Sequence, residues 1–300
     1  MDWLSAIEGT PTGHTVALFL ALAAAILHAI FGALQKGRHD PWISRMAIDL
    51  SYGLIAAPFA LFVVPWPEPH MWPIFAGAFV IHLCYKAVQA MTYTRGAFTV
   101  VYPVVRGTAP LFTVLGAMIV FNETYAPAQW VGIAVLLSGI FGLAVYNFVF
   151  LTVQRDTLLP ALGLAVLTGL IVALYTTYDA YGIRATANPF TFLAWFFFID
   201  GLTFPPLVAF FRRRAVARID DWGALARRGL IGGVVALASF GSIMMATRLD
   251  RVGDAAVLRE TSTVFAAAIG WIMLGEKVGP RRLALMALIA LGAIIVEFSG

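Results

Sequence analysis

Four polar side chains lie on one face of an otherwise apolar segment, and their types suit ligand binding. The spacing i, i+3, i+4 and i+7 places them on one stripe of a helix: His82, Tyr85, Lys86 and Gln89. Such groups rarely face lipid in a membrane and usually face a bundle interior or a wet cavity. The stripe predicts a cavity wall in which Lys86 or His82 donates to a carboxylate. Hydrogen bonds that only hold helices together are the alternative.

A second segment combines aromatic rings with one acid. Tyr175, Tyr178 and Asp179 are spaced at i, i+3 and i+4. Rings and a carboxylate suit an ammonium group through cation–π contacts and charge pairing, so we expect these side chains to bind substrate. For Tyr178, which falls near the end of its segment, anchoring at a membrane interface is an equal alternative.

Three more residues from other segments join the predicted site. Trp195 and Asp200 share one segment, and Asp200 lies near its middle. Three roles stay open for Asp200: binding an ammonium group, carrying a proton, or neutralising Lys86 or Arg106. His28 is assigned to the cavity from the first segment, with a packed, hydrogen-bonded role as the alternative.

Tyr102 and Arg106 stand one turn apart with a proline between them. A proline inside a helix frees a backbone carbonyl one turn earlier and can open the helix toward a cavity. We therefore predict that both line the cavity. Arg259 occupies the place of Arg106 in a second sequence repeat, and we expect it to form a gate or to pair with Glu260 or Asp254 rather than to bind substrate.

The composition requires these residues to sit in membrane helices. Hydrophobic residues make up 61% of the chain and charged residues 12%, against about 25% charged residues in a soluble domain. A helix needs about 20 apolar residues to cross the hydrocarbon core. Ten such stretches are expected, near 15–36, 44–64, 72–93, 97–121, 128–147, 158–181, 190–211, 229–247, 254–274 and 282–299.

The chain contains an internal duplication. The stretches FNETYAPAQWVGIAVLLSGI and LGEKVGPRRLALMALIALGA align at an offset of 153 residues. Each repeat, 1–152 and 153–300, holds five spans, and an odd number of spans forces the second repeat to enter the membrane from the opposite side. The fold class is therefore predicted as all-α, with two inverted five-helix repeats. Glu123 and Glu276 follow a span at the same place in each repeat, so we expect them to serve the fold.

Basic residues predict the orientation. Fourteen Lys and Arg residues lie beside the odd-numbered loops and three beside the even-numbered loops. The positive-inside rule then places the odd-numbered loops in the cytoplasm and both termini outside. The net charge of +4 is attributed to contact with anionic lipids, with no nucleic-acid partner.

Catalytic and metal-binding signatures are missing from the sequence. It contains no Walker loop, no G-x-S-x-G, no His-x-x-x-His pair and no cysteine cluster. We expect no catalytic residue, no metal site and no cofactor, and transport driven by ATP is not predicted.

The chain resembles the drug/metabolite transporter superfamily, in particular its two-repeat EamA-type permeases. The run AIFGALQKG, which ends at Gly37, is similar to the first element of the family repeat. Asn122-Glu123 with Gln129, and Gly275-Glu276 with Gly292, are similar to the second. The resemblance implies a central cavity lined by helices 1–4 and 6–9, with helices 5 and 10 outside it, and export of amino acids or related metabolites.

Together these features predict a secondary transporter of the bacterial inner membrane. It would export small metabolites, above all amino acids with apolar or aromatic side chains, by alternating access. We expect membrane lipids and a small-molecule substrate as partners, and a monomer, with a dimer as the alternative. The rivals are a carrier of cationic drugs or nucleoside-like metabolites in the same fold, and a lipid-handling membrane protein or membrane enzyme.

Overall fold

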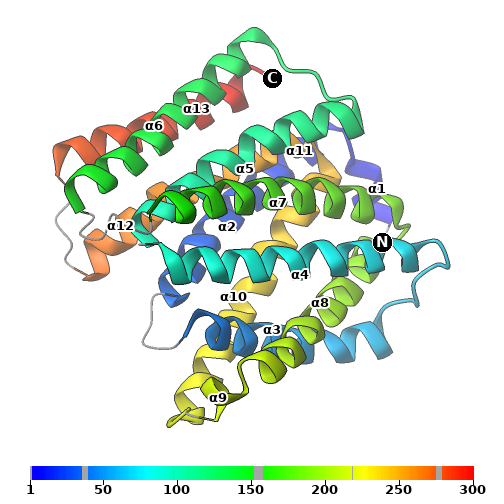
Figure 1. Cartoon of the computed structure of the whole chain (residues 1–300). Helices are drawn as coiled ribbons and strands as arrows, with labels where there is room; N and C mark the ends of the chain where they lie inside the picture. Colours follow the sequence, from blue (N-terminus) through cyan, green and yellow to red (C-terminus); the bar gives the residue numbers. More distant parts are fainter. Residues whose placement is uncertain (1, 36–39, 97, 152–157, 218, 275–278) are drawn as a thin grey trace.

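Helices form almost all of the part of the chain that the computed structural model describes, residues 2–35, 40–96, 98–151, 158–217, 219–274 and 279–300 (Figure 1). The elements are α1 (Asp2–Ile7), α2 (Pro11–Gln35), α3 (Pro41–Pro58), a π-helical turn η1 (Phe59–Val63), α4 (Met71–Arg95), α5 (Phe98–Phe121), α6 (Pro127–Leu151), α7 (Leu158–Ala185), α8 (Pro189–Phe211), α9 (Arg213–Val216), α10 (Trp222–Leu249), α11 (Val252–Arg259), α12 (Ser262–Leu274) and α13 (Pro280–Phe298).

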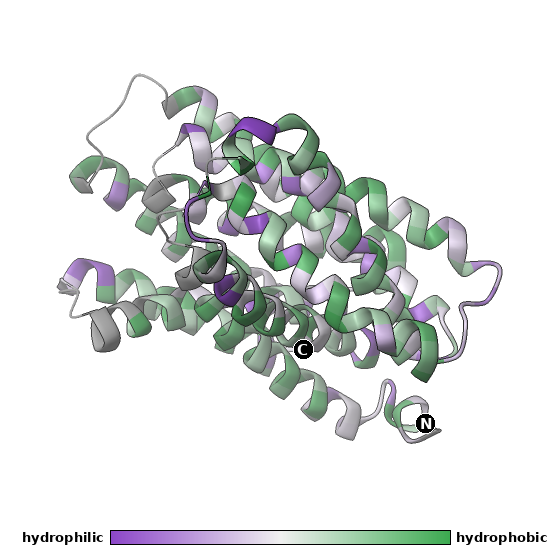
Figure 2. Cartoon of the chain, turned by 90° about the horizontal axis from the view of Figure 1, so that it is seen from below, coloured by the Kyte–Doolittle hydropathy of each residue, from purple (hydrophilic) through white to green (hydrophobic). Residues whose placement is uncertain are grey.

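Eight of the described helices are long and apolar enough to cross a membrane: α2, α3 continued through η1, α4, α5, α6, α7, α8 and α10. Large apolar side chains cover their outer faces, with Phe62 84% and Ile119 80% exposed. Figure 2 shows hydrophobic residues along the helices. This surface suits lipid, which solvates apolar side chains as well as a protein interior does. The protein is a multi-pass membrane protein.

Helix ends follow the turn residues of the sequence. The Asn188 side chain accepts a hydrogen bond from the amide of Phe190 at 2.9 Å, and Pro189 is the first residue of α8. The Asp40 side chain accepts from the amide of Trp42 at 2.8 Å and caps α3. Both are N-caps followed by a proline that needs no amide partner.

The expected single span over 254–274 is broken in the structure. α11 ends at Arg259 and α12 begins at Ser262. The amides of Glu260 and Thr261 donate to carbonyls three residues earlier, at 3.0 and 3.1 Å, which tightens the chain into a turn. The Thr261 hydroxyl also donates to the Leu258 carbonyl at 2.7 Å, and such hydroxyls compete with helical bonding.

Helices of the first half pack mainly on helices of the second half. α3 lies against α8 and α10, α4 against α7 and α8, α5 against α7 and α11, and α2 against α10, α11 and α12. α6 packs on α13 along one edge of the bundle (Figure 1). At the α3–α8 crossing, a Cβ on Gly201 would lie 2.4 Å from the Cα of Gly53, so glycine is needed there. This close approach brings the polar face of α3 against α8.

Glu123 ties the loop after α5 to the start of α11. Its carboxylate accepts from the amides of Val252 at 2.6 Å and Gly253 at 3.1 Å. The Tyr125 hydroxyl donates to the same carboxylate at 2.6 Å. Burial, followed by that hydrogen bond, raises the pKa of the Tyr125 phenol, so the phenol stays a donor. Glu276 lies outside the described residues.

Substitution Glu123→Gln tests whether Glu123 serves the fold. A carboxamide offers one acceptor oxygen in place of two, so at least one of three donors loses its partner. We expect a loss of about 1–3 kcal/mol in the free energy of unfolding, measured by denaturation in detergent micelles. Glu68→Gln makes the same change on an exposed loop and should cost little. Normal stability of Glu123→Gln together with lost substrate binding would contradict a role in the fold.

Candidate functional site

Lys86 lies at the centre of a buried ionic network. Its side chain is fully buried, and its Nζ lies 2.8 Å from Asp49 Oδ2 and 2.8 Å from Asp200 Oδ1. It also donates to the Tyr52 hydroxyl at 3.1 Å and to the Asp200 carbonyl at 2.9 Å. The sequence places Lys86 beside an aqueous cavity, whereas the structure surrounds it with partners from α3 and α8. Of the three roles left open for Asp200, the observed contacts are those of neutralising Lys86.

Sequence reasoning missed the contribution of α3. Arg45 Nε donates to Asp49 Oδ1 at 2.7 Å, and the Tyr52 hydroxyl donates to Asp200 Oδ2. These three residues of α3 are spaced at i, i+4 and i+7 within a predicted span. That spacing is the signal that could have found them, because charged residues on one helix face need partners inside a membrane.

His82 connects this network to α7. Its Nε2 lies 2.9 Å from Asp179 Oδ2, and its Nδ1 lies 3.9 Å from Asp200 Oδ1. The ring packs against Tyr175, with centroids 4.6 Å apart, and against Phe196 at 5.0 Å. His82, Lys86, Asp179 and Asp200 therefore belong to one cluster, drawn from α4, α7 and α8.

Arg106 forms a second ionic centre at the break between α11 and α12. Its Nε lies 2.8 Å from Glu260 Oε2. Its Nη2 donates to the Arg259 carbonyl at 3.2 Å and to the Ser262 hydroxyl at 2.9 Å. His28 Nε2 lies 3.5 Å from Arg106 Nη1. The broken helix thus exposes a carbonyl that Arg106 holds, and Glu260 pairs with Arg106 across the repeats.

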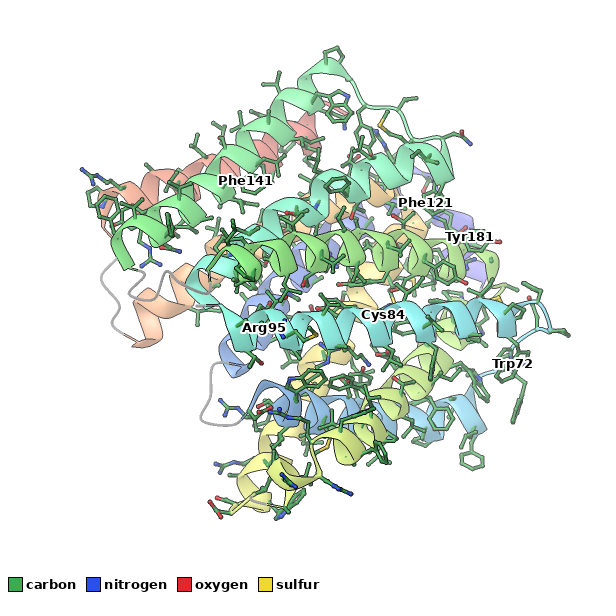
Figure 3. The ribbon with its side chains drawn as sticks, viewed as in Figure 1. Trp72, Cys84, Arg95, Phe121, Phe141 and Tyr181 are labelled. Carbon is green, nitrogen blue, oxygen red and sulfur yellow. The ribbon has the colours of Figure 1, made fainter. Side chains whose placement is uncertain are left out.

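The remaining predicted residues lie in different surroundings. Gln89 donates to the Tyr85 hydroxyl at 2.6 Å. Trp195 belongs to an aromatic cluster, with ring centroids 4.8 Å from Trp66 and 5.3 Å from Trp72. Tyr178 packs on Tyr181 at 6.4 Å. Figure 3 shows Trp72 and Tyr181 toward one end of the helices and Arg95 toward the other, so Trp195 and Tyr178 lie nearer a membrane interface than Lys86 does.

Tyr102 is half-buried in α5. It lies one turn before Arg106, as the sequence predicts.

A small cavity lies between α7, α10 and α11. It is lined by Tyr175, Thr176, Asp179, Phe240, Ile243, Met244, Thr247 and Arg259. Its volume is about 10 Å³, close to the room that one water molecule requires. A cavity of this volume is too small for a metabolite.

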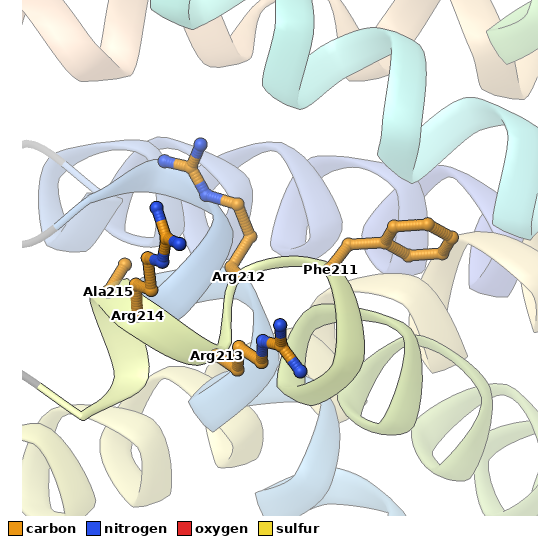
Figure 4. Close-up of a pocket in the computed structure, with 5 residues that line it drawn as sticks. All are labelled: Phe211, Arg212, Arg213, Arg214 and Ala215. Atoms are coloured by element: carbon orange, nitrogen blue, oxygen red, sulfur yellow. The ribbon is translucent and has the colours of Figure 1, made fainter.

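A second, open pocket lies at the basic end of α8. Figure 4 shows Arg212, Arg213 and Arg214 around it, with Phe211 and Ala215 completing the lining. Arg212 pairs with Asp40. This pocket belongs to a surface loop and is separate from the buried network.

The described residues contain no group of three or more His, Cys, Asp or Glu side chains that could hold a metal ion. Nine charged side chains of the described residues are buried, and eight of them lie in or beside the two ionic centres around Lys86 and Arg106. These eight are four cations (Arg45, Lys86, Arg106, Arg259) and four acids (Asp49, Asp179, Asp200, Glu260). The ninth, Asp254, lies 3.4 Å from Arg251. The formal charges of these eight groups sum to zero.

Comparison with known proteins identifies the second half of the chain. Residues 159–298 match the EamA-like transporter family. A solved chain described as "Crystal structure of protein" superposes with a TM-score of 0.74 at 16% identity, over 94% of this chain and 97% of that chain. At this identity the likeness shows a shared fold. No curated protein matches the chain.

Substitution Lys86→Met tests the ionic network. It leaves Asp49 and Asp200 buried with one cationic partner fewer, and we expect a loss of about 3–5 kcal/mol in the free energy of unfolding. Combining it with Asp200→Asn should restore part of the loss, because one buried negative charge is removed with the positive one. Denaturation of Lys86→Met, Asp200→Asn and the double variant in detergent micelles measures both effects. A single variant as stable as the native protein would show that these pairs do not form.

Proposed function

Because the chain carries an EamA-like transporter domain over residues 159–298, we propose that the whole protein is a secondary transporter. It exports small metabolites across the bacterial inner membrane by alternating access, and its cargo is amino acids with apolar or aromatic side chains. Substrate and lipids are its partners, and it works as a monomer. The observation that carries this proposal is the buried, electrically neutral ionic network within apolar helices.

The proposed architecture has ten spans in two inverted repeats, 1–152 and 153–300. In it, α11 with α12 forms the ninth span and α13 the tenth. The packing supports this arrangement. If each helix is replaced by its counterpart in the other repeat, the α4–α7 contact becomes the α10–α2 contact, and the α3–α10 contact becomes the α8–α4 contact. All four contacts occur in the structure. The same exchange converts the α6–α13 contact into itself, because these two helices are counterparts of each other. A Cβ on Gly132 would lie 2.9 Å from the Gly292 carbonyl oxygen, and the exchanged pair, Gly139 and the Leu285 carbonyl oxygen, would lie 2.7 Å apart.

The charge of the core supports a zwitterionic substrate. Ionisable groups inside a membrane protein usually face a transport pathway and pair with one another. Moving net charge into this neutral cluster costs free energy, because the interior screens charge poorly. An amino acid brings an ammonium and a carboxylate together and adds no net charge. A cationic metabolite is the second candidate, since Asp179 lies beside the rings of Tyr175 and His82.

Transport into proteoliposomes tests the proposed function. We expect counterflow of apolar and aromatic amino acids at rates well above those of cations and nucleosides, because cations add net charge to the core and uncharged nucleosides carry no ammonium and carboxylate groups to pair with its buried ions. A panel of radiolabelled compounds measures this, with empty liposomes as the control. Transport of cations alone would show that the substrate is a cationic metabolite and not an amino acid. Absence of transport across the whole panel would contradict the carrier function.

Fusions to the C-terminus test the proposed orientation. With both termini outside the cytoplasm, alkaline phosphatase fused after Gly300 should be active, because it folds only in the periplasm. A green fluorescent protein at the same place should be dark. The reverse pattern would overturn the orientation and leave the transport proposal standing.

A further inference from the structure

Arg259 is a buried cation whose guanidinium is incompletely paired, because Asp179 and Glu260 interact with its charge at a distance and neither forms a close ion pair with it. It is 3% exposed, and its buried Nε has no hydrogen-bond partner. Within the described part of the chain, no ion pair within 4 Å involves its guanidinium. A buried charge left unpaired is costly, by several kcal/mol in proteins that lose one member of a pair. An arginine in this position requires a functional reason.

The cavity in front of Arg259 holds other polar atoms that lack partners. Asp179 uses Oδ2 for His82, while its buried Oδ1 has no hydrogen-bond partner, and neither has the buried hydroxyl of Thr176. Both residues line the same small cavity as Arg259. Most buried polar atoms in proteins are hydrogen-bonded, so an unsatisfied cation and an unsatisfied acid in one cavity point to a ligand that carries both charges.

The sequence repeat explains why Arg259 lacks a close ion pair. Its repeat mate, Arg106, pairs with Glu260 at 2.8 Å. An offset of 153 residues places Gly107 where Glu260 would have its counterpart. Repeat one therefore supplies no acid for Arg259. Arg106 thus forms a structural ion pair, whereas its equivalent, Arg259, keeps its charge available for a ligand.

We propose that Arg259 binds the carboxylate of the transported amino acid and that Asp179 binds its ammonium group. This assignment rests on the proposed transport function and names the groups that bind the charged ends of the substrate. Guanidinium matches a carboxylate in a bidentate fork, and the free Oδ1 of Asp179 accepts from an ammonium group. Phe240, Ile243 and Met244 form the apolar part of the cavity lining, which suits an apolar side chain.

Binding of three related compounds to the purified full chain tests the assignment. The probes are phenylalanine, phenylalaninamide, which lacks the carboxylate, and 3-phenylpropanoate, which lacks the ammonium group. We expect the native protein to bind phenylalanine about tenfold or more tightly than either analogue, because each analogue leaves one buried charge unpaired. Arg259→Gln should lose this preference over phenylalaninamide, and Asp179→Asn should lose it over 3-phenylpropanoate. The binding preference of Arg259→Lys should lie between those of the native protein and Arg259→Gln, because lysine keeps the positive charge but lacks the two parallel donors of a guanidinium group.

Stability measurements separate binding from structure. Arg259→Gln should cost clearly less stability than Arg106→Gln, because Arg259 forms no ion pair within 4 Å among the described residues, whereas Arg106 pairs with Glu260 at 2.8 Å. Arg95→Gln, an exposed arginine at the end of α4, is the binding control and should bind phenylalanine normally.

Two results would overturn the assignment. One is native affinity and selectivity in Arg259→Gln, and the other is a loss of stability in Arg259→Gln as large as in Arg106→Gln. A native protein that transports only cations would also overturn it while the carrier function stands. Absence of any transport would instead remove the proposed function on which it rests.

Discussion

The pairing of Lys86 with Asp49 and Asp200 is the constraint on which the centre of the structure depends. An ammonium group that is fully buried among apolar helices is stable only when acids approach it closely. These acids lie on α3 and α8, and the glycines at 53 and 201 allow the two helices to approach. The network thus fixes how α3, α4 and α8 pack. It also orients His82, through which the network reaches Asp179 on α7.

The two repeats differ where substrate chemistry is proposed. In the described structure, the repeat-two glutamate at 260 neutralises the repeat-one arginine at 106, while glycine stands at the equivalent position, 107. A symmetric sequence would pair both arginines and leave no charge for a ligand. The break between α11 and α12 also has no counterpart in the first repeat, because α5 is continuous over the residues equivalent to 260 and 261. The proposed duplication accounts for the packing of the bundle, and divergence at single positions accounts for the proposed substrate site.

Sequence patterns predicted the eight described helices that are long and apolar enough to cross a membrane, because apolar length and helix caps are local signals. The break at Glu260 was not predicted, although the polar run from Arg259 to Thr263 is a local signal for it. That Arg106 binds the carbonyl of Arg259, 153 residues away, depends on tertiary packing. The stripe of His82 and Lys86 predicted a polar centre. Which acids pair with Lys86, and that Arg259 has no ion pair within 4 Å among the described residues, depends on helix packing that no local pattern contains.

Accessibility of the Arg259 cavity from the two sides of the membrane tests this description most directly. The single cysteine, Cys84, can be replaced by serine, and a cysteine can then be placed by Thr176→Cys in the cavity lining. We expect a membrane-impermeant thiol reagent to label this position under exchange conditions, and a transported amino acid to slow the labelling. A position that stays unlabelled from both sides, or labelling that the amino acid does not change, would show that this cavity is not on the transport pathway.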